Sequence, residues 1–478
     1  MEQNTRFSIL FRPTLIYSVL FTFCLYDNFK GILVAVLGVI TMVYCNLIDR
    51  RQMHQRKRDR LIYEIVFVLL ALSCGLTDNS GIVFFNLVGM VLVLVVMLLH
   101  DHQEDGSWSI MKYLTEIVKT GVNVVNGLAW FPADVREDHE RAENGRKKIT
   151  GDILIGLLIA MPVLAVILLL LRSADIVFAK VLNNLFLNFD VATCVLVILM
   201  TVFAFFVAYS GMRYFIRQSP IQPAEEQKRY EPIIAITGLT VISIVYLLFS
   251  GIQIAYLFIG DLSLPDGYTY AQYAREGFFQ LLIVCALNLL IVLFVLAWFR
   301  EHTVLKVLLA VISGCTYIMI ASSALRMVMY ISEYNLTRKR ILVLWALVVI
   351  GVLLAGVIVL IFRKNFRLFR YGLAVCLVCY LVLSFGRMDY WIAKYDVEHC
   401  AAEQRGSAVP WFESDADPDV PLEYLAGLSC DAAPVICDCR GTWADDYRDL
   451  ISGTKGDSIR QWNLSRYMAR QALKQYGK

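Results

Sequence analysis

Charged residues are scarce in this chain of 478 residues. They make up 18% of it, whereas about 25% is usual in a soluble domain. Hydrophobic residues reach 58%, against about 45–50% in such a domain. This apolar excess excludes a soluble enzyme and a disordered chain. The formal net charge of +3 is too balanced to indicate nucleic-acid binding.

Signatures of catalysis and metal binding are also missing. The chain has no P-loop lysine motif, no His-Glu-x-x-His and no Gly-x-Ser-x-Gly. The one ligand-like group among its six histidines is His100-Asp101-His102, followed by Glu104 and Asp105. Solvated charges are the favoured interpretation of this group, and a metal site is the alternative. We therefore expect a protein that is not an enzyme and that has no catalytic residues, metal or cofactor.

Long apolar runs are abundant instead. A bilayer core about 30 Å thick needs about 20 mainly apolar helical residues. The runs are continuously apolar, not alternating as in barrel strands, so they predict helices. The predicted spans are 7–26, 31–48, 61–76, 81–99, 153–171, 191–209, 233–259, 277–299, 304–331, 341–362 and 371–386. The expected fold is all-α: a polytopic transmembrane bundle of about 11 spans with a small C-terminal α-helical soluble domain.

The first span is the weakest of these, because Arg12 and Pro13 interrupt it. A secretory signal peptide is the alternative, but no small-residue cleavage site follows the apolar run. We therefore expect an uncleaved helix, with Arg12 reaching toward the membrane surface.

The distribution of Lys and Arg predicts the orientation, because cytoplasmic loops carry an excess of both residues. With a cytoplasmic N-terminus, most basic residues fall in the inner segments. The run Arg338-Lys339-Arg340 is a local exception, for which we expect only an anchoring role at the interface. Eleven spans then place the C-terminal tail outside, a conclusion that the loss of one span would reverse.

Composition divides the chain into four parts. They are residues 1–100, a four-helix membrane unit of two short hairpins; 101–150, a cytoplasmic interfacial helix and charged linker; 151–386, the main domain of seven spans; and 387–478, the C-terminal domain. In the first part, Asp27-Asn28 and Asp78-Asn79 each precede a glycine, which suggests a duplication or convergent turn chemistry. In the second, residues 108–131 predict a helix in the membrane interface or a helix packed on the bundle.

The C-terminal part has an acidic excess and no alternating strand pattern. Its expected helices cover 421–428, a segment capped by Asp431, 443–451 and 457–476. Its cysteines are Cys400, Cys430, Cys437 and Cys439. If this part lies outside the cell, an even number of cysteines permits disulfides, and free thiols are the other interpretation.

Ionisable residues inside the predicted spans are rare. For Glu64, a local ion pair with Arg60 four residues earlier is expected. Arg326 either reaches outward to the interface or is a partnered functional arginine, with Glu333 two turns later on the same face. Gln253 and Asn288 are expected to hydrogen-bond across helices.

Polar features gather in the segments predicted to lie outside, where they suggest an outward-facing recognition surface. The candidate residues are Arg172, Asp175, Tyr268, Tyr270, Tyr273, Arg275, Glu276, Arg326 and Glu333. A carrier of ions usually places carboxylates at the membrane midplane, and no midplane carboxylate pair is visible here.

Three motifs carry a resemblance to a known family. They are Ser173-Ala174-Asp175-Ile176-Val177-Phe178-Ala179, the segment from Tyr268 to Phe279, and Ser323-Ala324-Leu325-Arg326-Met327. Together they resemble the bacterial membrane-protein family catalogued as domain of unknown function 4173, related to 4153. At Asn335 and at Lys394-Tyr395-Asp396 the chain departs from the family pattern. The resemblance implies a multi-pass bacterial plasma-membrane protein and supplies no activity.

These observations favour a non-enzymatic sensing or scaffold protein. A transporter or channel for a weakly charged or amphiphilic substrate is the alternative. The expected partners are the lipid bilayer and a protein bound through the C-terminal domain, with no nucleic acid.

Overall fold

The computed structural model describes residues 6–52, 56–108, 110–141, 191–217, 230–255, 277–363, 366–406, 423–453 and 459–476, with scattered positions between 156 and 174. Within these ranges every regular element is a helix, and one isolated bridge joins Tyr230 to Phe299. The all-α expectation is therefore confirmed for this part of the chain.

Eight of the described helices are long and apolar enough to cross a membrane. They are α2 (Ile32–Arg51), α4 (Ser80–His102), α9 (Val191–Arg217), α10 (Pro232–Ile254), α12 (Phe278–Trp298), α13 (Thr303–Tyr334), α14 (Arg338–Phe362) and α15 (Leu368–Phe385). Two further apolar helices, α1 (Arg6–Leu25) and α3 (Arg60–Leu76), stand where the sequence predicts spans. The predicted span 153–171 lies largely outside the described residues. The chain has the architecture of a multi-pass membrane protein.

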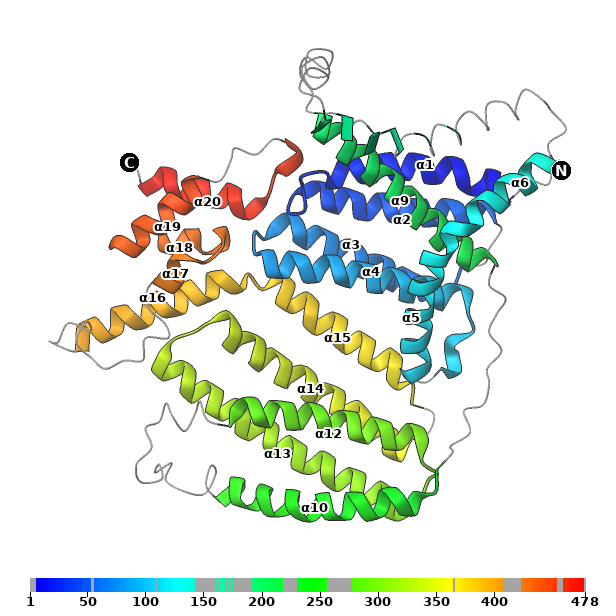
Figure 1. The fold of residues 1–478 in the computed structure, drawn as a ribbon. Coiled ribbons are helices and arrows are strands. Elements are labelled where there is room, and N and C mark those ends of the chain that lie inside the picture. The colour runs from blue at the N-terminus through cyan, green and yellow to red at the C-terminus, as the bar shows by residue number, and fades with distance from the viewer. Residues whose placement is uncertain are drawn as a thin grey trace.

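The apolar helices form two packed groups (Figure 1). In the first, α1 to α4 and α9 enclose Leu70, Met97 and Phe205. In the second, α10, α12, α13 and α14 enclose Val292 and Leu309. Helix α15 joins the groups, because it packs against α3 on one side and α14 on the other.

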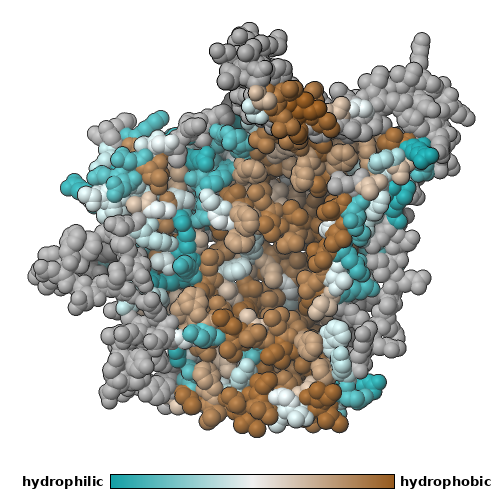
Figure 2. Space-filling model, viewed as in Figure 1, coloured by the Kyte–Doolittle hydropathy of each residue, from teal (hydrophilic) through white to brown (hydrophobic). Residues whose placement is uncertain are grey.

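Polar elements lie at both ends of these groups, and an apolar surface lies between them (Figure 2). At one end, here called the basic end, lie the α2–α3 link, α5 (Ile110–Asn126) and α6 (Phe131–Arg141). At the other, the cap end, lie the α1–α2, α3–α4 and α13–α14 turns. An apolar belt between two polar ends is the distribution expected of a protein that sits in a bilayer.

A group of helices after α15, here called the cap, covers the cap end. Its members are α16 (Met388–Gly406), α17 (Glu423–Ala426), α18 (Ala433–Ile436), α19 (Thr442–Ser452) and α20 (Leu464–Tyr476). Ile392, Ile436 and Tyr447 are among the residues of their shared hydrophobic core.

Two of the helices predicted here are present: 443–451 corresponds to α19, and 457–476 to α20, which begins later than expected. Helix α16 was not predicted, and the helix expected over 421–428 is the single turn α17. The prediction that Asp431 caps a helix is also wrong. The Asp431 side chain is buried and accepts hydrogen bonds from Thr77 and Ser429, so it belongs to a contact with the membrane helices.

Candidate functional site

Arg326 lies on α13 and faces its neighbouring helices. Its side chain is 8% exposed, and its Nη2 donates to Oε1 of Gln253 on α10 at 3.4 Å. The same oxygen accepts from Ser322 at 2.6 Å. Gly277 stands beside the guanidinium with a φ of +99°, where a side chain would be strained. Arg326 is thus a partnered arginine between helices, and outward snorkelling does not describe it.

A second set of polar contacts joins α10, α12 and α13. The Tyr246 hydroxyl on α10 donates to Asn288 on α12 at 2.7 Å, and Asn288 donates to Thr316 on α13 at 3.0 Å. Gln253 and Asn288 therefore hydrogen-bond across helices, as expected from the sequence. These contacts place several hydrogen-bonded polar atoms in the interior of the helix group.

The rest of the predicted outward cluster cannot be placed. Arg172, Asp175, Tyr268, Tyr270, Tyr273, Arg275 and Glu276 lie outside the described residues, and so does the side chain of Glu333. Among the candidates, only the Arg326 side chain is described.

The structure shows polar contacts between the cap and the membrane helices that sequence reasoning missed. Asn463, which is fully buried before α20, donates to the backbone oxygens of Lys30 at 2.6 Å and Thr77 at 2.9 Å. These oxygens belong to the α1–α2 and α3–α4 turns. The two similar turns are thus held side by side by one amide of the cap.

Asp389, near the start of α16, accepts hydrogen bonds from three other segments of the chain. Its carboxylate accepts from Asn79 at 3.0 Å, from the Ser429 backbone N–H at 3.1 Å and from Arg338 Nε and Nη2 at 2.7 Å each. Burial alone would raise the pKa of Asp389, but the bonds from Arg338 and Ser429 outweigh it and lower the pKa. One ionised carboxylate therefore joins the α3–α4 turn, α14 and the cap.

The same interface explains the basic run after α13, which the sequence analysis assigned only to anchoring. Arg338 pairs with Asp389, whereas Arg340 donates to the backbone oxygens of Tyr334 and Asn335 and lies over the Tyr330 ring at 4.1 Å. Asn335 has a φ of 65°, a conformation that asparagine tolerates better than most residues.

Asp396 of α16 faces this turn and is 2% exposed. Its Oδ1 accepts from the Leu336 backbone N–H at 2.7 Å, and its Oδ2 has no hydrogen-bond partner. Burial raises the pKa of Asp396 to about 7, although the Leu336 bond and Arg340 oppose the rise.

A second buried ionic group lies at the basic end. Arg60 is 2% exposed and contacts Glu64 at 2.9 Å, which confirms the predicted local pair. It also binds Asp49 of α2 at 2.5 Å and Asp101 of α4. The sequence gives no signal for the last two partners, because they come from separate helices.

In the His100–Asp105 segment, His100, Asp101 and Asp105 are buried, which contradicts the expectation of solvated charges for these three; Glu104 is exposed, as expected. Asp105 accepts from His100 at 2.7 Å and from Tyr113, and it pairs with Lys57 at 3.6 Å and Arg370 at 3.4 Å. Burial works against ionisation, but the bonds from His100 and Tyr113 lower the pKa of Asp105 to about 2. Among the described residues, no group of three or more His, Cys, Asp or Glu side chains could hold a metal ion.

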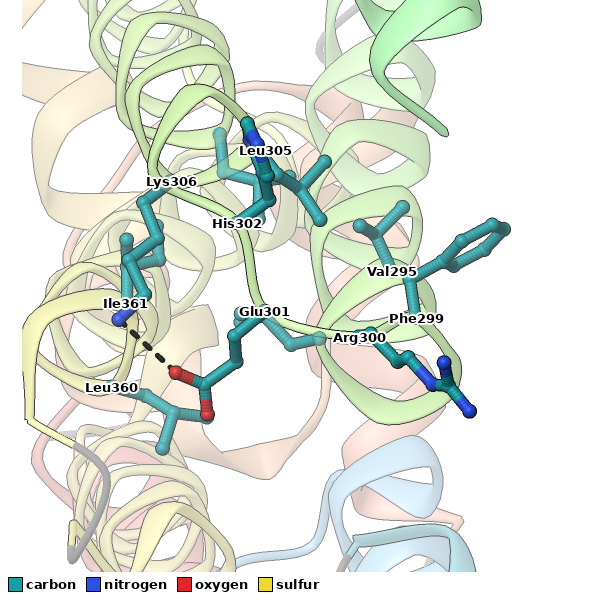
Figure 3. Close-up of a pocket in the computed structure, with 11 residues that line it drawn as sticks. Val295, Phe299, Arg300, Glu301, His302, Leu305, Lys306, Leu360 and Ile361 are labelled. Carbon is teal, nitrogen blue, oxygen red and sulfur yellow. Dashed lines mark ion pairs between the residues drawn. The ribbon is translucent and has the colours of Figure 1, made fainter. Parts of the chain in front are cut away.

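A pocket opens at the basic end between α12, α13 and α14 (Figure 3). Lys306 and Glu301 form an ion pair of 3.2 Å there, beside the apolar Leu360 and Ile361. Its volume of about 240 Å³ is below the range of about 300–1,000 Å³ usual for small-molecule sites.

Cys430, Cys437 and Cys439 of the cap are free thiols, and the side chain of Cys400 lies outside the described residues. Burial raises the pKa of Cys437 to about 11 and that of Cys430 to about 12. The thiolate form needed for redox or nucleophilic chemistry is therefore disfavoured at both positions.

A family model described as a domain of unknown function (DUF4153) matches residues 65–438. The matching family is thus 4153, which is related to the expected family 4173, and not 4173 itself. No curated protein and no solved structure matches the chain.

Proposed function

Because this chain belongs to the DUF4153 family, whose description assigns no function, we propose its role from its own residues: a non-enzymatic sensing or scaffold protein of the bacterial plasma membrane. In this proposal the N-terminus is cytoplasmic, about 11 spans cross the bilayer, and the cap is an extracytoplasmic α-helical domain. The cap carries the surface that binds a protein partner.

Asp389 is the single observation that carries the proposal. Its carboxylate contacts Asn79 of the first helix group, Arg338 of the second and Ser429 of the cap. When a bound partner moves the cap, the bonds of Asp389 transmit that movement to both helix groups. Such a link between an exposed surface and two membrane units suits signal transfer or assembly.

The cap also exposes large apolar side chains that could receive a partner. Leu450 of α19 is 57% exposed, and Tyr467 and Tyr476 of α20 are 46% and 49% exposed. Exposed tyrosines are common anchors of protein interfaces, and an exposed leucine adds apolar area that a partner can bury.

Cross-linking in intact cells, followed by purification of the tagged chain, tests this surface. We expect one stoichiometric partner, which is lost from Leu450→Lys and retained by the control variant Glu398→Lys on the exposed side of α16. Equal partner recovery from both variants would contradict the proposed surface.

Transport of a weakly charged or amphiphilic substrate is the second candidate. The buried polar contacts of Gln253, Arg326 and Asn288 between α10, α12 and α13 favour it. Uptake by proteoliposomes separates the two functions: saturable flux that Arg326→Ala abolishes would establish transport and overturn the scaffold proposal.

A further inference from the structure

The helix α5 presents its apolar side chains outward and its polar side chains inward. The exposed stripe consists of Met111, Leu114, Val118, Val122 and Val125, which are 48–67% exposed. On the opposite face, Tyr113, Glu116 and Thr120 are buried. A helix on the surface of a soluble protein has the reverse arrangement.

The buried polar face of α5 is already satisfied within the protein. The Tyr113 hydroxyl donates to Asp105, and Thr120 donates to the backbone oxygen of Glu116 at 2.7 Å. Glu116 pairs with Lys119 at 2.8 Å. Of these bonds, the one from Tyr113 reaches a residue outside α5; together with the burial of Glu116 and Thr120 it points this face inward and the apolar stripe outward.

The two ends of α5 touch the ends of two spanning helices. Near its first turn, Tyr113 stacks on Phe369 at the start of α15, with ring centroids 3.5 Å apart. Near its last turn, Cγ2 of Val124 packs against the backbone of Gly211 on α9, 3.9 Å from where a Cβ on that glycine would stand. Because both contacts are near span ends, α5 runs across the bundle and not along it (Figure 1).

The contact with α9 also fixes the depth of α5. It lies just before Arg213, whose guanidinium binds Asp134 of α6. On the other side of the contact, α9 exposes the apolar side chains of Phe203 and Val207. The contact of α5 with α9 thus lies where the exposed apolar side chains of α9 give way to charged ones.

We infer that α5 lies flat in the membrane–water boundary at the basic end, with its stripe among the lipid acyl chains. Trp130, which follows α5, is of a residue type that favours this boundary. Lys112 adds positive charge suited to anionic headgroups, whereas the charge of Lys119 is paired with that of Glu116. Through Tyr113, the helix connects this bilayer surface to α15, which joins the two helix groups.

Photo-cross-linking of the full chain tests the inference. Benzoylphenylalanine is placed at Val118 of the stripe, at Phe203 of α9 as the lipid-facing reference and at Glu137 of α6 as the exposed polar control. Each variant is reconstituted in vesicles of phosphatidylethanolamine and phosphatidylglycerol. Adducts are then identified by mass spectrometry. Val122, on the same stripe, provides a second position in case the probe at 118 disturbs folding.

We expect the yield of phospholipid adduct at 118 and 122 to be about tenfold above that at 137 and within about twofold of that at 203. A yield as low as that at 137 would show that the stripe faces water. Adducts mainly with a second protein chain would show that it is a protein interface. Either result would overturn the inference.

Discussion

Arg338 and Asp389 form a bidentate ion pair, in which Nε and Nη2 of the guanidinium each lie 2.7 Å from a carboxylate oxygen. The planar guanidinium matches the carboxylate geometry, and the Asp389 side chain is fully buried. The pair joins the start of α14 to the start of α16. Together with the bond from the Leu336 N–H to Asp396, it attaches the cap to the second helix group.

Replacement of Asp389 should loosen this attachment. Asp389→Asn leaves the Arg338 guanidinium without its counter-ion, and we expect a loss of about 2–4 kcal/mol in stability, since broken buried pairs cost about 3–5 kcal/mol and Arg338 is partly exposed. Limited proteolysis in detergent should cleave the cap faster in this variant. The exposed neighbour Lys339→Ala serves as the control, and a cap equally resistant in all three proteins would contradict the prediction.

The stability of the cap should fall as the pH rises from about 4 to 7. The pKa of Asp396 is raised to about 7, so in this interval the folded chain keeps a proton that the unfolded chain has released. The protonated carboxyl stabilises the fold, and its loss weakens the contact between α16 and the α13–α14 turn. Each pKa unit corresponds to about 1.4 kcal/mol.

Asp396→Asn mimics the protonated state and should remove this pH dependence. We expect its melting temperature to exceed that of the wild type at pH 8 and to match it near pH 4. Asp446→Asn, on the exposed face of α19, is the matched control. If the Asp396→Asn variant is less stable than the wild type at pH 8, the ionised carboxylate is the favoured form and the prediction is wrong.

Removal of Arg60 should be among the most damaging single changes in the chain. Arg60→Ala leaves Asp49 and Asp101 buried without their cation, and we expect a loss of about 3–5 kcal/mol. Arg58→Ala, two residues earlier and exposed, should change stability by less than about 0.5 kcal/mol. Thermal unfolding of both variants in the same detergent provides the comparison.

The proposed orientation can be tested with one cysteine at each end. Lys339→Cys at the cap end should react with a membrane-impermeant maleimide added outside intact cells. Arg58→Cys at the basic end should react only after the membrane is opened. The unmodified chain reports the background from its own thiols. The reverse pattern of labelling would place the cap in the cytoplasm.

The sequence predicted contacts well where the partners are close along the chain. The Arg60–Glu64 pair follows from a spacing of four residues on one helix face. Asp49 and Asp101 give no such signal, because nothing local to them indicates that α2 and α4 meet at Arg60. The candidate site shows the same limit: Gln253 and Arg326 were each singled out, but their contact depends on how α10 packs against α13.

Among the described residues, the apolar helices lie close to where the sequence predicts them, because the length and hydropathy of a run are local properties. The likeness of the two Asp-Asn turns is also visible in the sequence. That both turns meet Asn463 of the cap, more than 380 residues away along the chain, follows from the folded structure alone. A buried polar group must find a partner, and the partner is set by which distant segments the folded chain brings together.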